Sequence, residues 1–461
     1  MFKRIVLTTA LAVVVVAGVA ADVYAQGGRG RGGAPAGAQK VTAIRAGRLV
    51  DPETGSAAAN QIILVEGERI KEIGANVAIP AGAEVIDLSR LTLVPGFVDT
   101  HTHLAMTYKE VPENNIYYYT YVADSTPLRA IQAASSAMQL LSSGFTVACD
   151  TGNNGNYADT ALRQAIEQGW IPGPTIIPSG LIISTTGGQF TPTPEMYKGH
   201  NIVYPEYLEA NSRDEIVKAV RENLLFGAKA IKICLDCKPW GYSVDDIKLF
   251  ISEAAKGGAK VHAHVQTRDG AQRAIDAGLH VIVHGQQISP EQHAQMAQKS
   301  IYLASTDTPF TPYHGSAQGQ KHAADQLKSA WEKGVPVTFS TDMDYWSENF
   351  KNDKGEWMNR GELTINFLLT WKAAGIPAKD TLKALTTNGY KAADVYKDQR
   401  GPIKVGYFAD IVAVEGDPLT NIDAVRNVRF VMKNGEVFKR NGVITVDKLL
   451  HPGPVNGFRR R

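Results

Sequence analysis

Eight short apolar segments, each rich in β-forming residues, recur along the middle of the chain, and longer amphipathic segments separate them. Strands that alternate with helices predict a parallel sheet. Eight such units predict closure into a (β/α)8 TIM barrel, an α/β fold. An open doubly wound sheet is less well supported, because no glycine-rich phosphate loop follows the first strand. The predicted strands are 93–101, 145–150, 175–179, 230–235, 260–265, 280–284, 301–305 and 336–341.

The amphipathic segments repeat apolar residues at the spacing of a helix face. Seven of them lie between the predicted strands, and two more follow the eighth strand. The predicted helices are 128–141, 158–168, 213–225, 244–255, 271–277, 290–298, 323–332, 362–374 and 378–396.

Both flanks of this central region show short strands and turns instead of strand–helix alternation. Such patterns are typical of antiparallel sheets, and neither flank alone is long enough for a large core. We therefore expect the two flanks to meet as one small composite β-sandwich beside the barrel. The predicted strands are 41–48, 61–66, 69–73, 84–87, 410–414, 428–433 and 436–440.

The N-terminus reads as a targeting segment. Lys3 and Arg4 precede an apolar run over residues 5–20, and residues 23–25 (VYA) offer small side chains where a signal peptidase cuts. This predicts a signal peptide and a periplasmic or secreted protein. The apolar run is shorter than the ~18–20 residues that span a bilayer, which disfavours an uncleaved anchor and any stable membrane insertion after cleavage.

The length of 461 residues suits a barrel with a small appended domain. The formal charge of +2 gives no sign of a nucleic-acid partner, so we expect a small-molecule substrate. The oligomeric state, a homo-oligomer included, stays open. The expected organisation is a signal peptide (1–25), a flexible linker (26–40), sandwich (41–92), barrel (93–400), sandwich (401–446) and a tail (447–461).

The chain has three cysteines, of which Cys234 and Cys237 are close in sequence. Export implies an oxidising compartment, so we expect these two to form a disulfide. A zinc finger would need a second pair of ligands, which the sequence lacks.

Polar side chains gather at the predicted carboxyl ends of the strands, where barrels of this class place their active sites. His101 and His103 end the first strand, and side chains two positions apart on a strand face the same way. Imidazole and carboxylate together suit zinc or a similar divalent ion. The other polar groups at this rim are Lys232, His264, His284 and Asp342.

Each of these residues has a structural alternative. A lone histidine is often a hydrogen-bonded core group, a lysine in a strand can point outward, and an aspartate after a strand often caps a helix. All six falling at the same ends of one barrel's strands by chance is improbable, and this favours a functional site.

Residues 95–103 (PGFVDTHTH) resemble the first-strand signature of the amidohydrolase superfamily. The resemblance extends over roughly residues 41–445, and is greatest to a branch with Xaa-Pro dipeptidase-like, carboxypeptidase-like and imidazolonepropionase-like enzymes. Further matching features are residues 227–233 (GAKAIKI), the twenty-residue spacing from His264 to His284, residues 340–342 (STD) and residues 406–412 (GYFADIV).

This resemblance implies a site for two divalent ions, most simply zinc. His101, His103 and Asp342 would hold one ion, and His264 and His284 the other. Lys232 would be carboxylated and bridge both, because a carbamate offers two anionic oxygens where an ammonium offers no lone pair.

The implied activity is hydrolysis of an amide-type C–N bond, in a dipeptide or an N-acyl amino acid, by a metal-bridging hydroxide. Asp342 would take the proton from the hydroxide and pass it to the leaving nitrogen. A lactonase or cyclic-amide hydrolase on the same binuclear site is the alternative. A non-catalytic metal- or carbohydrate-binding protein would not need the complete ligand set. A deaminase would use one metal and a catalytic Glu.

Two histidines are not expected to bind metal. His262 lies on the same face as His264, two residues deeper, and is predicted to support the ligands or fill the core. His280 begins its strand at the opposite end of the barrel and is predicted to be structural. Substrate contacts are predicted at Gln189, which stands where relatives often have His, and at Tyr118, Tyr119, Tyr313 and His314, although such aromatic loops also pack on neighbouring helices or subunits.

Overall fold

The computed structural model describes most of the chain between the predicted linker and the predicted tail. The described residues are 40–108, 124–152, 154–190, 194, 195, 197, 206–306, 317–346, 355, 358–394 and 399–445. The predicted signal peptide, the linker except Lys40, and the predicted tail lie outside them. Among the helices described, none is long and apolar enough to cross a membrane.

The parallel strands in the described part of the chain form a ring that consists of two sheets, which backbone hydrogen bonds join to each other. The third position in the ring is shared by two short strands, since β7 pairs with β6 and β8 pairs with β10. The ring closes where the backbone N–H groups of Thr341 and Asp342 donate to the carbonyl oxygen of His101, at 3.1 and 2.7 Å. The strands are β5 (Phe97–Tyr108), β6 (Phe145–Asp150), β7 (Thr175–Pro178), β8 (Ile182–Ser184), β10 (Ala230–Cys234), β11 (Lys260–Val265), β12 (Val281–His284), β13 (Tyr302–Ser305) and β14 (Val337–Phe339).

These strands are apolar on both faces. This is typical of a parallel sheet whose outer face is covered by helices and whose inner face packs in the barrel interior. Every residue of β6, β10 and β12 is buried. The predicted TIM barrel is therefore confirmed. Two further short strands extend the sheets at their edges: β9 (Tyr207–Glu209) beside β8, and β15 (Met343–Trp346) beside β5.

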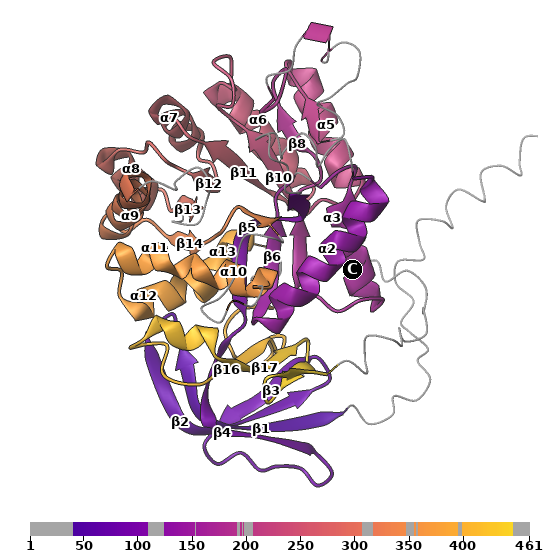
Figure 1. Cartoon of the computed structure of the whole chain (residues 1–461), viewed down its shortest axis with the longest axis vertical. Coiled ribbons are helices and arrows are strands. Elements are labelled where there is room, and N and C mark those ends of the chain that lie inside the picture. The colour runs from indigo at the N-terminus through magenta and orange to yellow at the C-terminus, as the bar shows by residue number, and fades with distance from the viewer. Residues whose placement is uncertain are drawn as a thin grey trace, which may run out of the picture. The chain divides into compact units, whose positions relative to one another are not determined.

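Helices connect the strands and cover the outside of the ring (Figure 1). Several begin with a capping box, in which a Ser or Asn side chain and the residue three positions later bond to each other's backbone N–H. Ser212, Ser243, Ser289 and Asn359 cap helices in this way. The helices are α2 (Thr126–Ser142), α3 (Ala158–Gln168), α5 (Arg213–Leu225), α6 (Val244–Lys256), α7 (Arg268–Ala277), α8 (Pro290–Gln298), α9 (Ala317–Glu332), α10 (Arg360–Asn366), α11 (Leu368–Ala373), α12 (Ala378–Lys383), the π-helix η2 (Ala384–Asn388) and α13 (Gly389–Ala393).

A second sheet combines the two flanks of the barrel sequence, as expected. Its order is β19-β18-β17-β16-β4-β1-β2-β3, so strands from the two ends of the chain meet where β16 pairs with β4. The free edge at β3 bonds to the segment before β16, through Ile70 N and the carbonyl of Tyr407 at 2.9 Å. The sheet thereby folds over one shared apolar core. Its strands are β1 (Val41–Asp51), β2 (Ser56–Glu66), β3 (Arg69–Gly74), β4 (Glu84–Pro95), β16 (Ile411–Val414), β17 (Val428–Lys433), β18 (Glu436–Arg440) and β19 (Val443–Ile444).

Gly96 alone separates the last N-terminal strand of this sheet from the first strand of the barrel. The predicted strand over residues 93–101 is thus the junction of two strands, β4 and β5. A Cβ atom at Gly96 would lie 2.0 Å from Oγ1 of Thr146, so a larger residue would clash with β6. The backbone N–H of Gly96 donates to the carbonyl oxygen of Asp410 at 3.2 Å, which ties the junction to the C-terminal part of the sheet.

Candidate metal centre

The six residues predicted as metal ligands lie on barrel strands or, in the case of Asp342, shortly after one. β5 carries His101 and His103, β10 carries Lys232, and β11 and β12 carry His264 and His284. Asp342 follows β14. All but Asp342 are nearly inaccessible to solvent, and the Asp342 side chain is 31% exposed. The carboxylate of Asp342 therefore faces the open side of the site.

One carboxylate oxygen of Asp342 contacts two imidazole rings. Its Oδ1 lies 3.0 Å from Nε2 of His101 and 2.9 Å from Nε2 of His103. Its Oδ2 lies 3.8 Å from Nδ1 of His284. Ligand atoms of His101, His284 and Asp342 all lie within 4.8 Å of one another. Residues from the first and the last strand segments of the barrel are thus in contact at this site.

The remaining histidine extends this group toward β11. The ring centroids of His264 and His284 lie 4.4 Å apart, and those of His101 and His284 lie 5.4 Å apart. His284 is thus the link between the first-strand histidines and His264. The structure brings together all four histidines that the sequence predicts as ligands.

Polar groups next to the strand ends fix the orientation of these rings. Thr151 Oγ1 lies 2.8 Å from Nδ1 of His101, and Thr306 Oγ1 lies 2.7 Å from Nδ1 of His284. The carbonyl oxygen of Gly152 lies 2.8 Å from Nδ1 of His103. Partners of this kind set the tautomer of a metal-binding histidine. None of the three was predicted from the sequence, although each directly follows a predicted strand or lies one residue beyond it.

The contact of His103 with Gly152 tests whether these residues suit a cation. A carbonyl oxygen only accepts, so Nδ1 of His103 carries the proton, and in the neutral ring Nε2 presents a lone pair. That lone pair faces a carboxylate oxygen at 2.9 Å. Two acceptors facing each other need a cation between them, so the donor set fits a divalent metal.

Burial keeps the histidines neutral. It lowers the pKa of His101 to about 3 and that of His264 to about 4, and the nearby charge of Lys232 acts in the same direction. The pKa of His284 also lies well below its ordinary value, first because of burial. Burial alone would raise the pKa of Asp342, but the neighbouring His284, His101 and His103 hold it well below the usual range. Neutral imidazoles and an ionised carboxylate are the states that bind metal.

Lys232 lies inside the barrel among these ligands and is 3% exposed. Burial lowers the pKa of its amine to about 7. Lys232 is the partner of His262 across β10 and β11, two positions before the pair of Cys234 and His264, so its side chain lies on the same inner face as that of His264. Its charge also lowers the pKa values of His101, His264 and His284. The structural alternative, a lysine that points outward to solvent, is therefore wrong.

Two of the candidate ligands have backbone conformations that non-glycine residues rarely adopt. The φ angles of His284 and Asp342 are 70° and 53°, in the left-handed region. Each such residue costs about 1–3 kcal/mol, and such strain concentrates at functional sites. The strain turns both side chains toward the first-strand histidines.

Arg360 and Asp99 support the first strand from beneath. The guanidinium of Arg360, fully buried, donates to Thr102 Oγ1 at 2.8 Å and to the carbonyls of His103 and Met343. Asp99 accepts from Thr341 Oγ1 at 2.7 Å and from the backbone N–H of His101 at 3.2 Å. These bonds join β5 to the segment that carries Asp342.

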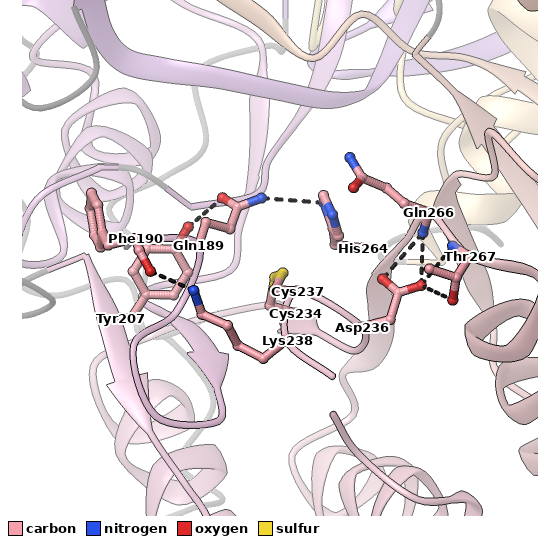
Figure 2. The surroundings of a disulfide bond; sticks show 10 residues. All are labelled: Gln189, Phe190, Tyr207, Cys234, Asp236, Cys237, Lys238, His264, Gln266 and Thr267. Carbon is pink, nitrogen blue, oxygen red and sulfur yellow. Dashed lines mark hydrogen bonds between the residues drawn. A yellow bond between two sulfur atoms is a disulfide. The ribbon is translucent and has the colours of Figure 1, made fainter. Parts of the chain in front are cut away.

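The predicted substrate residue Gln189 contacts the site. Its Nε2 lies 3.4 Å from Nδ1 of His264, and its Oε1 accepts a hydrogen bond from the hydroxyl of Tyr207 (Figure 2). Tyr207 is 1% exposed and belongs to β9, a strand too short to predict. The other four predicted substrate contacts, Tyr118, Tyr119, Tyr313 and His314, lie outside the described residues.

His262 and His280 lie deeper in the barrel. His262 is paired with Lys232 across β10 and β11, and within the described residues neither of its ring nitrogens has a hydrogen-bond partner. Nε2 of His280 lies 3.0 Å from the carbonyl oxygen of Ala392 in α13, and His280 itself directly precedes β12. In the described part of the chain, neither ring bonds to the carboxylate of Asp342 as His101 and His103 do.

Comparison with known proteins agrees with the fold and with the family that the sequence resembles. The model of the amidohydrolase family matches residues 92–438. Ochratoxinase of Aspergillus niger is 25% identical over 449 residues, covering 88% of this chain and 88% of that protein. Imidazolonepropionase of Alkaliphilus metalliredigens is 25% identical over 421 residues, covering 82% and 90%. A solved Xaa-Pro dipeptidase with methionine bound in its active site superposes with a TM-score of 0.74 at 26% identity, covering 87% of this chain and all of that one.

Proposed function

Because the chain belongs to the amidohydrolase family and is a hydrolase, we propose that it cuts an amide-type C–N bond in a small molecule with the help of two divalent metal ions. The observation that carries this proposal is the convergence of His101, His103 and His284 on the carboxylate of Asp342. A structural histidine cluster would not need two strained residues and a buried lysine at the same place.

The ligands divide into two groups. His101, His103 and Asp342 would hold one ion, and His264 and His284 the other, with zinc as the metal that these donors suit. Lys232 would bridge both as a carbamate. Its lowered pKa supports this, because a large fraction of the amine is neutral near pH 7, and only the neutral amine reacts with carbon dioxide.

When bound, two such ions supply an activated water near neutral pH and polarise the scissile carbonyl. Asp342 is placed to accept the proton of that water, since its carboxylate is ionised and its side chain faces the open side. It would then donate this proton to the leaving nitrogen. Thr151, Gly152 and Thr306 hold the rings in place during the reaction.

For the substrate we propose an amide bond next to a free carboxylate, as in a dipeptide or an N-acyl amino acid. The likeness to a solved Xaa-Pro dipeptidase supports this choice. The mouth of a barrel is a concave site, which suits short ligands better than a folded chain. A lactone or a cyclic amide is the alternative on the same site.

Metal analysis combined with a substrate screen tests the proposal. Purified active protein is expected to hold two equivalents of metal, and strong chelation is expected to abolish its activity. A dipeptide, its C-terminal amide, an N-acyl amino acid and a lactone are compared by kcat/KM. Equal values for the dipeptide and its amide would remove the carboxylate from the proposal. Activity confined to lactones would overturn the amide assignment, and full activity with one ion or none would overturn the binuclear site.

We also propose that residues 1–25 are removed on export, which the basic start and the apolar run support. N-terminal sequencing of the exported protein is expected to begin at Gln26. Export with Met1 retained would show an uncleaved anchor instead.

A further inference from the structure

A disulfide lies at the edge of the proposed metal centre. Cys234 is the last residue of β10, two positions after Lys232, and it pairs with Cys237 in the turn that follows. The Cα atoms of the pair lie 5.6 Å apart, an ordinary separation for a bridge. Figure 2 shows the two cysteines beside the contact that joins Gln189 to His264. The predicted pairing is confirmed, and its place beside a metal ligand is one that the spacing of the cysteines does not reveal.

Both cysteines lie within reach of a proposed metal ligand. A ring nitrogen of His264 and the sulfur atoms of Cys234 and Cys237 all lie within 4.8 Å of one another. Cys234 and His264 are direct partners across β10 and β11, so their side chains share the inner face. Cys234 is buried, whereas Cys237 is partly exposed. The outer sulfur is therefore accessible to a reagent from solvent.

The loop that carries Cys237 is fixed to the loop after His264. The carboxylate of Asp236 accepts from the backbone N–H of Gln266 at 3.0 Å and of Thr267 at 2.8 Å (Figure 2). Leu235 N donates to the carbonyl of His264 at 3.2 Å, and Tyr242 N closes the turn onto the carbonyl of Leu235 at 3.1 Å. These bonds do not involve either sulfur. The two cysteines and His264 are thus held together by the backbone as well as by the bridge.

We propose that Cys234, Cys237 and His264 form a second, redox-gated zinc site, which exists only when the disulfide is reduced. Two thiolates and one imidazole are a soft donor set that suits zinc, with a fourth position left for water or another ligand. A disulfide sulfur carries no negative charge and binds metal much more weakly than a thiolate does, so the oxidised protein lacks this site.

The chemistry balances with a dithiol reductant. The reductant transfers two electrons and two protons to the Cys234–Cys237 bond, which breaks to give two thiols, and it becomes a disulfide itself. Zinc binding then forms two Zn–S bonds and releases both thiol protons to solvent. Oxidation reverses the sequence and expels the ion.

The second site shares His264 with the proposed catalytic pair. This consequence, unlike the thiolate site itself, rests on the proposed function. A histidine nitrogen committed to the thiolate-bound ion is lost to the catalytic ion. Reduction in the presence of limiting metal is therefore expected to lower hydrolysis, and reoxidation to restore it.

Cobalt(II) is the probe, because thiolate ligands give it a charge-transfer absorption in the near ultraviolet that imidazole and carboxylate ligands do not. The full chain is stripped of metal, treated with a water-soluble phosphine, freed of it under argon, and titrated with Co²⁺. The reduced protein is expected to show this absorption and the oxidised protein to lack it. Cys237→Ser is expected to abolish it, and Cys149→Ala, which removes the free buried cysteine, to leave it unchanged.

Thiol titration before adding cobalt makes the test decisive. Reduced protein with three free thiols and no charge-transfer absorption would overturn the proposal, as would an absorption that survives Cys237→Ser. A disulfide that the phosphine cannot reduce would also overturn the proposal, because such a disulfide could not control zinc binding. Failure of the proposed function is separate. It would appear as oxidised protein that binds no metal and hydrolyses nothing, whatever the reduced protein does with cobalt.

Discussion

Nε2 of His103 lies 2.9 Å from Oδ1 of Asp342, although 239 positions separate the two residues in the chain. The contact spans the closure of the barrel, because β5 is its first strand and β14, just before Asp342, its last. The proposed metal centre is therefore complete only when the barrel is closed. Binding of metal should then stabilise the closed barrel by mass action, since the open chain has no such site.

Replacing Asp342 with Asn is expected to lower kcat by about 10²–10⁴-fold, with a much smaller change in KM. Asn keeps an oxygen toward His101 and His103 but cannot accept and donate the proton. Steady-state kinetics on the best substrate of the screen checks this. Asp325→Asn, an exposed residue of α9 paired with Lys321, is the control and should change neither constant. A rise in KM with kcat unchanged would show that Asp342 only binds substrate.

Replacing Lys232 with Ala is expected to lose bound metal and activity together, because the bridging carbamate is gone. A short carboxylic acid such as propionate is expected to restore part of both by supplying two oxygens in the cavity left by the side chain. Lys229→Ala, three residues earlier and before β10, is the matched control. A Lys232→Ala protein with full metal content would contradict the bridging role.

Tyr207→Phe is expected to weaken metal binding about 10-fold. The substitution removes the hydroxyl that donates to Oε1 of Gln189, so Gln189 holds the ring of His264 less firmly. Competition with a coloured chelator measures the metal affinity. Tyr197→Phe removes a hydroxyl that bonds to Glu209 instead, so its affinity should equal that of the unaltered protein. Equal affinities in both variants would exclude the positioning role of Tyr207.

Arg129 and Glu206 form a buried ion pair beside the barrel mouth, with 2% and 1% of their side chains exposed. Glu206→Gln is expected to lower the free energy of unfolding by about 3–5 kcal/mol, because the buried guanidinium of Arg129 loses the charge of its Glu206 partner. Glu167→Gln breaks an exposed pair with Arg163 and should cost at most about 1 kcal/mol. Urea unfolding of both variants gives the comparison, and similar losses would refute the argument from burial.

Lys433 predicts an unusual dependence of stability on pH. Burial lowers the pKa of its amine from 10.5 to about 8, with help from Arg400 and opposition from Asp410. Between these values the unfolded chain binds a proton that the folded chain does not, so the contribution of Lys433 to stability rises with pH from about 8 to about 10. Urea unfolding across this range should show the rise. Lys433→Met should remove it, and Lys71→Met, an exposed lysine of the same sheet, should retain it.

The regular strands and helices of the barrel were predictable because the spacing of their apolar residues distinguishes a strand from a helix. The predicted strands 145–150 and 260–265 and the predicted helix 213–225 have the bounds of β6, β11 and α5. β8 and β9, of three residues each, are too short for any period to emerge. The predicted helix 323–332 begins six residues later than α9, whose first turns carry too few apolar residues to show a stripe.

The convergence of the candidate ligands at one site was predictable from residue type on neighbouring strands, but the groups that support them were not. Thr151 and Thr306 look like any threonine after a strand until the ring nitrogens they touch are placed. Tyr207 bonds to Gln189, which contacts His264, but it comes from a segment with no motif. The position of Cys237 against His264 depends on the carboxylate of Asp236, which accepts from backbone N–H groups of another loop, and these bonds leave no trace in the spacing of the cysteines.

The single glycine between β4 and β5 means that the barrel cannot be excised as an independent fragment. A truncated chain that begins at the barrel would start only five residues before His101, and would lack the incoming strand that precedes Gly96. Removing the C-terminal part of the sheet as well would take away the carbonyl of Asp410 that holds Gly96. The strand that carries His101 and His103 would then begin without a structured neighbour. For protein engineering, the composite sheet therefore belongs to the scaffold of the candidate site, and a tag or fusion should be placed at the C-terminus, not at this junction.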